Sequence, residues 1–109
     1  MKKALIAAAL ATSSLTHAEF VSGNYLYEQM TGQTSNQIWA IGYVTGVADA
    51  GWNVGWCPPP GLTVRQLYDL VQQRLAAAPA LRHYTADSLI MIVLRSVYPC
   101  QQNRQRQDL

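Results

Sequence analysis

The stretch that decides the fold class runs from Thr63 to Pro79 and reads TVRQLYDLVQQRLAAAP. It opens with a capping box, because the Thr63 hydroxyl can accept a hydrogen bond from the Gln66 N–H while the Gln66 side chain reaches back. Apolar side chains then recur at three- and four-residue steps, at Val64, Leu67, Tyr68, Val71 and Leu75. Pro79 ends the pattern because proline breaks a helix interior. This stretch therefore predicts an amphipathic helix in which Thr63 and Gln66 are structural residues.

A second helical pattern covers residues 85–97 and is apolar around most of its circumference. Thr85 suits the N-cap position, and Pro99 follows the last turn. The apolar positions are Ala86, Leu89, Ile90, Val93, Leu94 and Val97, with Met91 and Ile92 widening the stripe. We expect this helix to lie at the centre of the core.

Two further helices are predicted nearer the N-terminus. One begins at the N-cap Ser22 and ends at Gly32; the other begins after Asn36 and reaches the Trp52 region. Apolar and small residues on the second repeat at helical steps, at Ile38, Ile41, Gly42, Thr45 and Ala48. Signals for strands are weak, because the β-branched residues sit inside helical periodicity. The sequence predicts an all-α fold, a small bundle of about four helices.

Gly42 and Gly46 form a GxxxG pair on the second of these helices. In a membrane span such a pair favours helix dimerisation, but Asp49, Asn53 and the short length argue against a span. We expect the two glycines to let another helix or a bulky ring pack closely.

The N-terminus has the three parts of a secretory signal peptide. Lys2 and Lys3 form a positive n-region, residues 4–15 are mostly apolar, and residues 16–18 supply a small-x-small cleavage site. The strictly apolar run at its start is far shorter than the roughly 18 to 20 residues that a membrane span needs. We expect cleavage after Ala18, export to the periplasm, and no membrane span after processing.

Removal of residues 1–18 leaves a neutral chain. Both lysines are lost, so six arginines balance six acidic residues and the formal charge falls from +2 to zero. Nucleic-acid-binding proteins gather lysines and arginines on one face. Because no lysine remains after cleavage and the chain is neutral, we exclude that class of protein. Residues 19–100 are expected to form one domain, and the Gln- and Arg-rich residues 101–109 a disordered polar tail.

Cys57 and Cys100 are predicted to form a structural disulfide, since an exported domain of this size often needs a covalent link. They lie 43 residues apart, and closing such a loop contributes roughly 4 kcal/mol in the loop-entropy model. A metal site or a nucleophilic thiol would need His or Cys partners that the sequence lacks. We expect no metal and no cofactor.

Catalytic residues are not apparent. His83 is the only histidine after cleavage, and Asp87 lies four residues further on. A nucleophile is missing, so we interpret His83 as a structural hydrogen-bonding residue at the start of the last helix. Phosphate-binding loops and paired carboxylates are absent from the sequence. We expect a protein that is not an enzyme.

Residues 51–61 read GWNVGWCPPPG and are the most informative loop. Two tryptophans on a Gly- and Pro-stiffened segment beside a disulfide predict a rigid aromatic projection, although both rings can instead fill a small core. Trp52 continues the apolar face of the preceding helix, so we expect Trp52 to be buried and Trp56 to be exposed. The predicted binding residues are Asn53, Trp56, Pro58, Pro59 and Pro60.

Five ordered motifs extend over residues 22–100. They are Ser22-Gly23-Asn24, Gly42-Tyr43-Val44-x-Gly46-Val47-x-Asp49, Cys57-Pro58-x-x-Gly61-x-Thr63-x-x-Gln66-Leu67, Pro79-x-x-Arg82-His83-x-x-Ala86, and Tyr98-Pro99-Cys100. Together they resemble the Tai-type immunity proteins, small helical periplasmic proteins that protect bacteria from peptidoglycan amidase toxins delivered by type VI secretion. Members commonly carry a further cysteine pair, and the matching positions here are Met30 and Ala40.

The resemblance implies a protein partner, an amidase effector, whose substrate cleft the protein occludes without catalysing a reaction. The surface in contact would come from the Trp52–Pro60 segment and its neighbours. The sequence also leaves open whether the protein forms a homodimer.

Two other functions compete with immunity. A small acid-activated periplasmic chaperone is also helical and disulfide-linked, but it depends on many carboxylates, and residues 19–100 contain five. A phage- or plasmid-encoded envelope factor could reuse the same fold. An amidase gene beside this one would favour immunity, and a lysis or morphogenesis cassette would favour the envelope factor.

Overall fold

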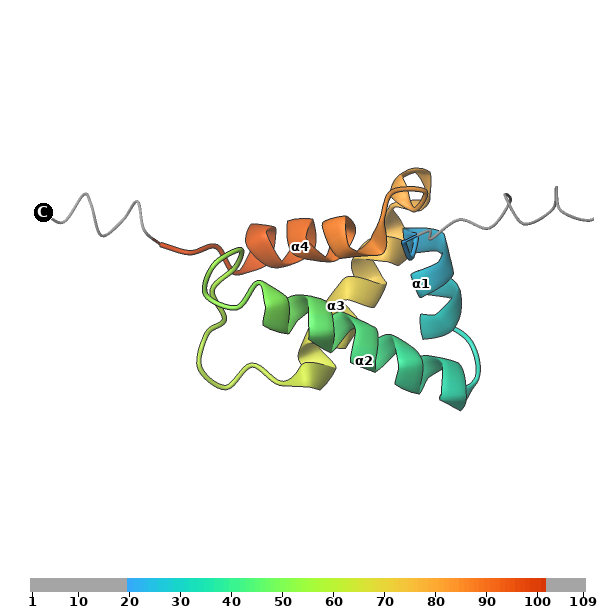
Figure 1. Ribbon diagram of the computed structural model, residues 1–109, viewed down its shortest axis with the longest axis horizontal. Coiled ribbons are helices and arrows are strands. Elements are labelled where there is room, and N and C mark those ends of the chain that lie inside the picture. The colour runs from blue at the N-terminus through green and yellow to red at the C-terminus, as the bar shows by residue number, and fades with distance from the viewer. Residues whose placement is uncertain (1–19, 102–109) are drawn as a thin grey trace, which may run out of the picture.

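The computed structural model describes residues 20–101, which form four α-helices and one 3-10 turn (Figure 1). Their bounds are Gly23–Met30 for α1, Thr34–Ala50 for α2, Val64–Ala77 for α3, Pro79–Leu81 for the turn η2, and Ala86–Val97 for α4. Within this range β-pairing is limited to two isolated bridges, Ser22 with Thr85 and Trp52 with Trp56. The all-α prediction is confirmed.

The predicted helix starts are largely confirmed. The Ser22 hydroxyl accepts from the Tyr25 N–H at 3.1 Å, and the capping box of α3 forms, with the Gln66 N–H donating to Thr63 Oγ1 at 3.1 Å. Helix α2 begins earlier than predicted, since Gln33 is its N-cap and the Gln33 N–H donates to Asn36 Oδ1 at 3.2 Å. An Asn at the third helical position replaces the Gln or Glu that the usual capping box carries, which is why this start is harder to recognise.

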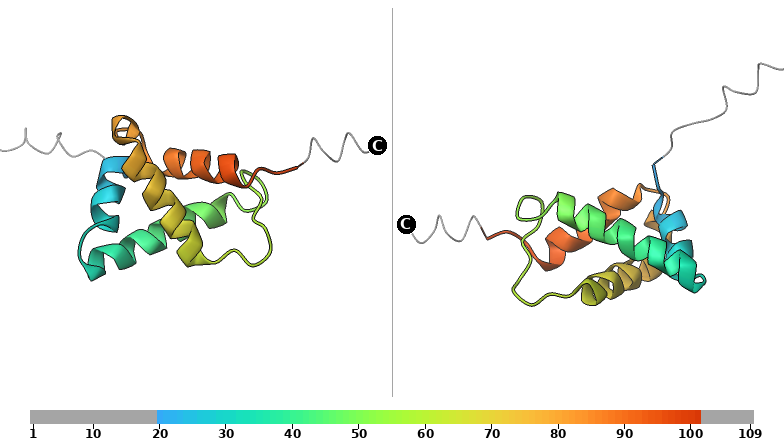
Figure 2. Two further views of the ribbon diagram at one scale, coloured as in Figure 1. Left: turned by 180° about the vertical axis from the view of Figure 1, so that it is seen from behind. Right: turned by 60° about the horizontal axis from the view of Figure 1, so that its bottom comes forward.

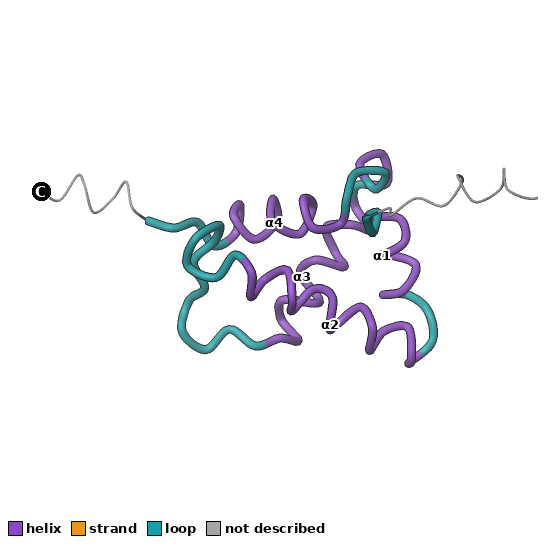
Figure 3. The backbone as a smooth tube through the Cα atoms, viewed as in Figure 1, coloured by secondary structure: helices purple, strands orange, loops and turns teal. Residues whose placement is uncertain are grey.

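The helices pack around one core. Helices α2 and α4 run in the same direction, and α3 crosses them from behind, as the reverse view shows (Figures 1 and 2). Helix α1 closes one end of this arrangement, and the long connection between α2 and α3 closes the other (Figure 3). This connection contains the loop predicted to bind a partner, so the fold places that loop at one end of the domain.

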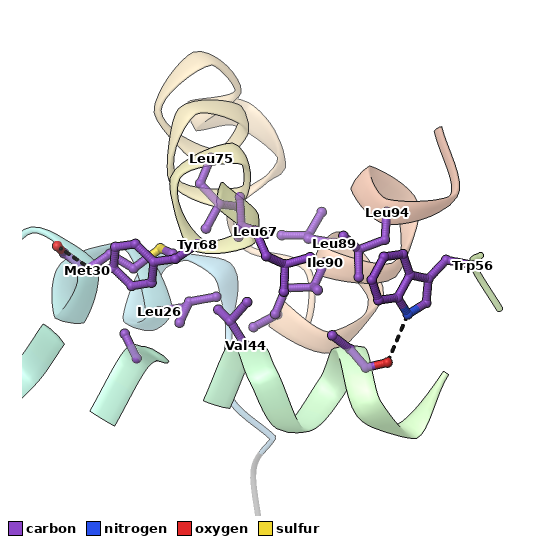
Figure 4. Packing of buried hydrophobic residues seen from close by; sticks show 14 residues of the cluster. Leu26, Met30, Val44, Trp56, Leu67, Tyr68, Leu75, Leu89, Ile90 and Leu94 are labelled. Atoms are coloured by element: carbon purple, nitrogen blue, oxygen red, sulfur yellow. Dashed lines mark hydrogen bonds between the residues drawn. The ribbon is translucent and has the colours of Figure 1, made fainter. Parts of the chain in front are cut away.

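The buried core draws side chains from every helix and from the long connection (Figure 4). Its members are Leu26, Met30, Ala40, Val44, Ala48, Trp56, Leu67, Tyr68, Val71, Leu75, Ala86, Leu89, Ile90 and Leu94. The Tyr68 hydroxyl donates to the Met30 carbonyl at 3.0 Å, which satisfies its polar end in the interior. Met30 and Ala40, which replace the second cysteine pair of the resembled family, are both buried.

Backbone hydrogen bonds tie the start of α1 to the segment before α4. The N–H groups of Gly23 and Asn24 donate to the carbonyls of Tyr84 and Arg82 at 2.8 and 2.7 Å, and the Ala86 N–H donates to Val21 at 2.7 Å. A Cβ on Gly23 would lie 2.9 Å from the Arg82 carbonyl oxygen, so this position needs glycine. The first and last helices are therefore joined directly.

The Cys57–Cys100 disulfide is confirmed, with the two Cα atoms 4.8 Å apart. Beside it the Cys57 N–H donates to the Tyr98 carbonyl at 2.9 Å, so the connection is fixed to the end of α4 by one covalent bond and one hydrogen bond. Helices long and apolar enough to cross a membrane do not occur between residues 20 and 101. The predicted signal peptide, residues 1–18, and residues 102–109 of the predicted tail lie outside the described range.

Candidate functional site

Trp56 is buried, so the prediction that it is the exposed tryptophan is wrong. Its side chain is 1% exposed, and its indole Nε1–H donates to the Ala48 carbonyl at 2.8 Å (Figure 4). The cause is a tight turn after α2, in which the N–H groups of Val54, Gly55 and Trp56 point back to the Gly51 carbonyl at 3.0, 2.8 and 3.4 Å. This turn reverses the chain and returns the Trp56 ring to the core.

Trp52 is exposed, so the prediction that it is buried is also wrong. Its side chain is 52% exposed and meets the Trp56 ring edge-on, with the ring centroids 5.6 Å apart. Helix α2 ends at Ala50 with Gly51 as its C-cap, so the apolar face of the helix does not continue to residue 52. Extrapolating helical periodicity past a glycine produced the error.

The remaining predicted binding residues are exposed, with one exception. Asn53 is exposed and adopts a φ of 59°, in the left-handed region that Asn tolerates better than most residues. Pro59 and Pro60 are exposed, whereas Pro58 is half-buried. Val54, which was not among the predicted binding residues, is 83% exposed. We call the exposed group Trp52, Asn53, Val54, Pro59 and Pro60 the loop surface.

Gly51 and Gly55 let the loop backbone pack closely against Met91 of α4. A Cβ on Gly51 would lie 2.6 Å from Met91 Cε, and a Cβ on Gly55 would lie 2.9 Å from Met91 Sδ. Both glycines therefore admit the Met91 side chain against the loop backbone. The loop is held in place before any partner binds, which lowers the conformational entropy lost on binding.

Gly42 and Gly46 do not pack against a helix or a ring, which corrects the prediction made for them. A Cβ on either residue would meet no atom within 4 Å, and both are exposed. They line an open groove of about 870 Å³ between α2 and α4. The groove residues are Gly42, Tyr43, Gly46, Val47, Ala50 and Gly51 on the α2 side, and Asp87, Ser88, Met91, Ile92 and Arg95 on α4.

Charge is sparse around this groove. Burial raises the pKa of the Tyr43 phenol, and the Asp87 carboxylate beside it raises that pKa further.

Across residues 20–101 the one ion pair joins Arg65 to Asp69 at 3.4 Å on an exposed face of α3, where such pairs contribute little. Clusters of His, Cys, Asp or Glu able to hold a metal ion do not occur in the same range.

His83 is exposed at the start of α4. Its ring lies 4.2 Å from that of Tyr84, and its side chain forms no hydrogen bond with the described part of the chain, in contrast to the role predicted for it. The neighbouring Arg82 has the structural contact, because its guanidinium lies 4.3 Å from the centre of the Tyr27 ring. The Arg-His motif thus contributes to packing mainly through Arg82.

An aromatic row that was not predicted from the sequence lies on α1 and α2. The Trp39 ring meets Tyr25 edge-on and stacks on Tyr43, with both centroid distances 5.4 Å, and it is 40% exposed. Trp39 and Tyr43 are four residues apart on α2, a spacing that places them on one helix face. That spacing was available in the sequence.

A small helical domain with an exposed aromatic loop and an open groove offers two surfaces that suit binding to another protein. The family model of the Rap1a immunity proteins matches residues 22–100. The chain belongs to this family of type VI secretion immunity proteins, and the resemblance to the Tai-type proteins is consistent with it. No curated protein matches the chain.

Proposed function

We propose that this protein binds a peptidoglycan amidase toxin in the periplasm and occludes the substrate cleft of that toxin without catalysing a reaction. Membership of the Rap1a immunity family over residues 22–100 carries this proposal, because an immunity protein acts on a toxin partner. The amidase as the target is supported by the motif resemblance to the Tai-type proteins. The disulfide supports the periplasm, since such bonds persist in oxidising compartments.

The loop surface is the proposed contact, with Trp52 in place of Trp56 as its central side chain. Three features hold the loop rigid: the Cys57–Cys100 disulfide, the indole hydrogen bond of Trp56, and the packing of Met91 on Gly51. A half-exposed tryptophan on a rigid support loses little entropy when a partner covers it. Such a projection suits insertion into the cleft of an enzyme.

The test measures the affinity of the mature protein for the amidase encoded by a neighbouring gene, together with inhibition of peptidoglycan cleavage. Trp52→Ala should weaken binding by about thirtyfold or more, which corresponds to about 2 kcal/mol for a central interface tryptophan. Tyr84→Ala is the matched control, because Tyr84 is 53% exposed, close to the 52% of Trp52, and precedes the start of α4, whereas the loop is bonded to the end of α4.

Two results would count against the proposal. Equal affinity of the Trp52→Ala variant and the wild type, with the variant still folded, would exclude the loop surface. Uninhibited cleavage in the presence of a saturating amount of the folded wild-type protein would exclude that amidase as the target.

A further inference from the structure

Asp49 has an unfavourable position in the last turn of α2. Its carboxylate is exposed, and it forms no ion pair within residues 20–101. The carbonyl end of a helix carries a partial negative charge, so that a basic side chain there is stabilised and an acidic one is repelled. Asp49 is the only charged residue among the 17 of this helix, and the last turn contains no basic residue to balance it. The end of α2 therefore lacks the cation that its charges favour.

Asp49 also lines a small hollow beside the loop surface. The hollow has a volume of about 50 Å³ and lies between the second half of α2, the loop and the start of α3. This space is larger than one water molecule needs and much smaller than a site for a drug-sized ligand, so it fits the end of one side chain. Asp49 is the only charged residue in its lining.

The two hydroxyl groups in this lining already have partners. The Thr45 hydroxyl donates to the Ile41 carbonyl at 2.7 Å, and the Thr63 hydroxyl accepts from the Gln66 N–H at 3.1 Å. The Asp49 carboxylate is therefore the polar group of the hollow that is free to bind a ligand.

Trp52 forms an exposed wall of the same hollow. Its N–H donates to the Asp49 carbonyl at 3.2 Å, which fixes the two residues relative to each other. Its ring meets Trp56 edge-on, at an interplanar angle of 81°, and 52% of its side chain is exposed. The face of a tryptophan ring attracts cations more strongly than that of any other side chain. Both cation–ring contacts between residues 20 and 101 involve tyrosines, so the Trp52 ring remains available.

Three features at one place thus favour a positive charge: the Asp49 carboxylate, the carbonyl end of α2 and the Trp52 ring. Leu62 and Val64 add apolar surface to the hollow, against which the methylene stem of a long basic side chain can pack. An arginine fits better than a lysine, because its planar guanidinium can stack on an aromatic ring and can also pair with a carboxylate through two hydrogen bonds.

We propose that Asp49 and Trp52 form a receptor for an arginine side chain of the protein partner, whose guanidinium lies against the Trp52 ring and pairs with the Asp49 carboxylate. This inference rests on the proposed function, because it takes the toxin as the partner and the loop surface as the contact, and it names the chemistry of that contact. It extends the contact from the loop onto the end of α2. The bound guanidinium supplies the cation that this helix end lacks.

The first test uses a small probe in place of the toxin. N-acetyl-arginine amide is titrated into the mature protein while NMR follows the indole N–H signal of Trp52. We expect a saturable shift of this signal, and Asp49→Asn should weaken the affinity by about tenfold, as expected for a lost hydrogen bond to a charged group. N-acetyl-citrulline amide has nearly the same shape without the charge and should leave the signal unmoved. A wild type that responds to neither probe, or equally to both, would overturn the proposal.

The second test measures toxin binding by the Asp49→Asn variant. The affinity should fall by at least about tenfold, and the dissociation constant should depend less on salt. The melting temperature should not fall, because the substitution removes an acid from the carbonyl end of a helix. A lower melting temperature would assign the carboxylate to the fold and overturn the proposal.

Glu28→Gln is the matched control for this variant. Glu28 is also an exposed acid in the last turn of a helix, and its replacement changes the net charge by the same amount. It lies on α1, which closes the other end of the domain (Figure 1). Glu28→Gln should leave the affinity for the toxin unchanged, and an equal loss in both variants would show a general charge effect in place of a receptor.

Failure of this inference is distinguishable from failure of the proposed function. Toxin binding that depends on Trp52 but not on Asp49 would overturn the receptor and leave the proposed function intact. If the amidase does not bind at all, the proposed function fails, while the NMR titration still tests the receptor. If the probe binds only after Arg104 and Arg106 are both replaced by glutamine, the chain's own tail fills the receptor, and its assignment to a partner is overturned.

Discussion

Two pairs of glycines within one short segment of the chain have opposite surroundings. Gly51 and Gly55 are pressed against Met91, whereas Gly42 and Gly46 face open space. The first pair makes room for the end of the Met91 side chain, and the second pair leaves room that the described chain does not use. The difference teaches that glycine has two effects in this protein. At Gly51 and Gly55 it lets the loop backbone pack against Met91, and at Gly42 and Gly46 it leaves the groove between α2 and α4 unfilled.

The largest expected effect separates the two tryptophans at the loop end. Trp56→Ala should lower the free energy of unfolding by about 3 to 5 kcal/mol, because it empties a fully buried site in the core. Trp52→Ala should cost about 1 kcal/mol, mainly the edge-on contact between the rings. Urea denaturation of both variants measures the difference, and equal losses would contradict the assignment of Trp56 to the core.

The disulfide should have the next largest effect. Replacing both cysteines by serine should lower the free energy of unfolding by about 2 to 4 kcal/mol, because the link restricts the unfolded chain. The loss should fall mainly on the loop end, where Cys57 also holds the Tyr98 carbonyl. Hydrogen exchange of the amides of residues 51–62, compared with those of α1, checks this location; uniform loss of protection would contradict it.

Alanine substitutions should sharpen the contrast between the glycines. Gly51→Ala should destabilise by up to about 1 kcal/mol, because the flexible end of the Met91 side chain has to move. Gly42→Ala should instead stabilise by about 0.5 to 1 kcal/mol, the helix preference of alanine over glycine. Both are measured by urea denaturation, and a destabilising Gly42→Ala would show that the groove is not open.

The smallest effect concerns the two tyrosines with raised pKa values. Burial is the main cause at both Tyr43 and Tyr68, so the folded state favours the protonated phenol. The contribution of these two tyrosines to the free energy of unfolding is therefore fully present below the ordinary pKa of about 10. It is lost as the pH rises above that value. Tyr68→Phe should cost about 1 kcal/mol at neutral pH through the lost bond to Met30, and should flatten the decline above pH 10. An unchanged alkaline decline would assign it to Tyr43 or to other groups.

The fold was predictable from the sequence because its signals are local. The capping box at Thr63 and the periodicity of residues 85–97 depend on neighbours within a few positions, and both correspond to observed helices. The disulfide was predicted from the presence of two cysteines in a chain with a predicted export signal. Local physics of this kind does not depend on how the helices pack.

The candidate site was harder to predict because it depends on contacts between distant segments. The burial of Trp56 requires the turn at Gly51 and the position of Ala48 relative to it, and neither is encoded by periodicity. The open groove at Gly42 depends on where α4 lies, so the spacing of the glycines predicted a close contact that does not exist. The aromatic row at Trp39, by contrast, has a local signal, the four-residue spacing of Trp39 and Tyr43.

The backbone bonds between the start of α1 and the segment before α4 have a consequence for how the chain folds. Gly23 and Asn24 find their partners at Tyr84 and Arg82, about sixty residues further along the sequence. Contacts of such long separation slow the search for the native state, because a large loop must close before they form. When only the first three helices have left the ribosome or a translocation channel, Tyr84 and Arg82 are not yet available. The N–H groups of Gly23 and Asn24 at the start of α1 then have no partners. We therefore expect folding to finish after residue 86 has emerged, so the domain should stay loose for most of its synthesis.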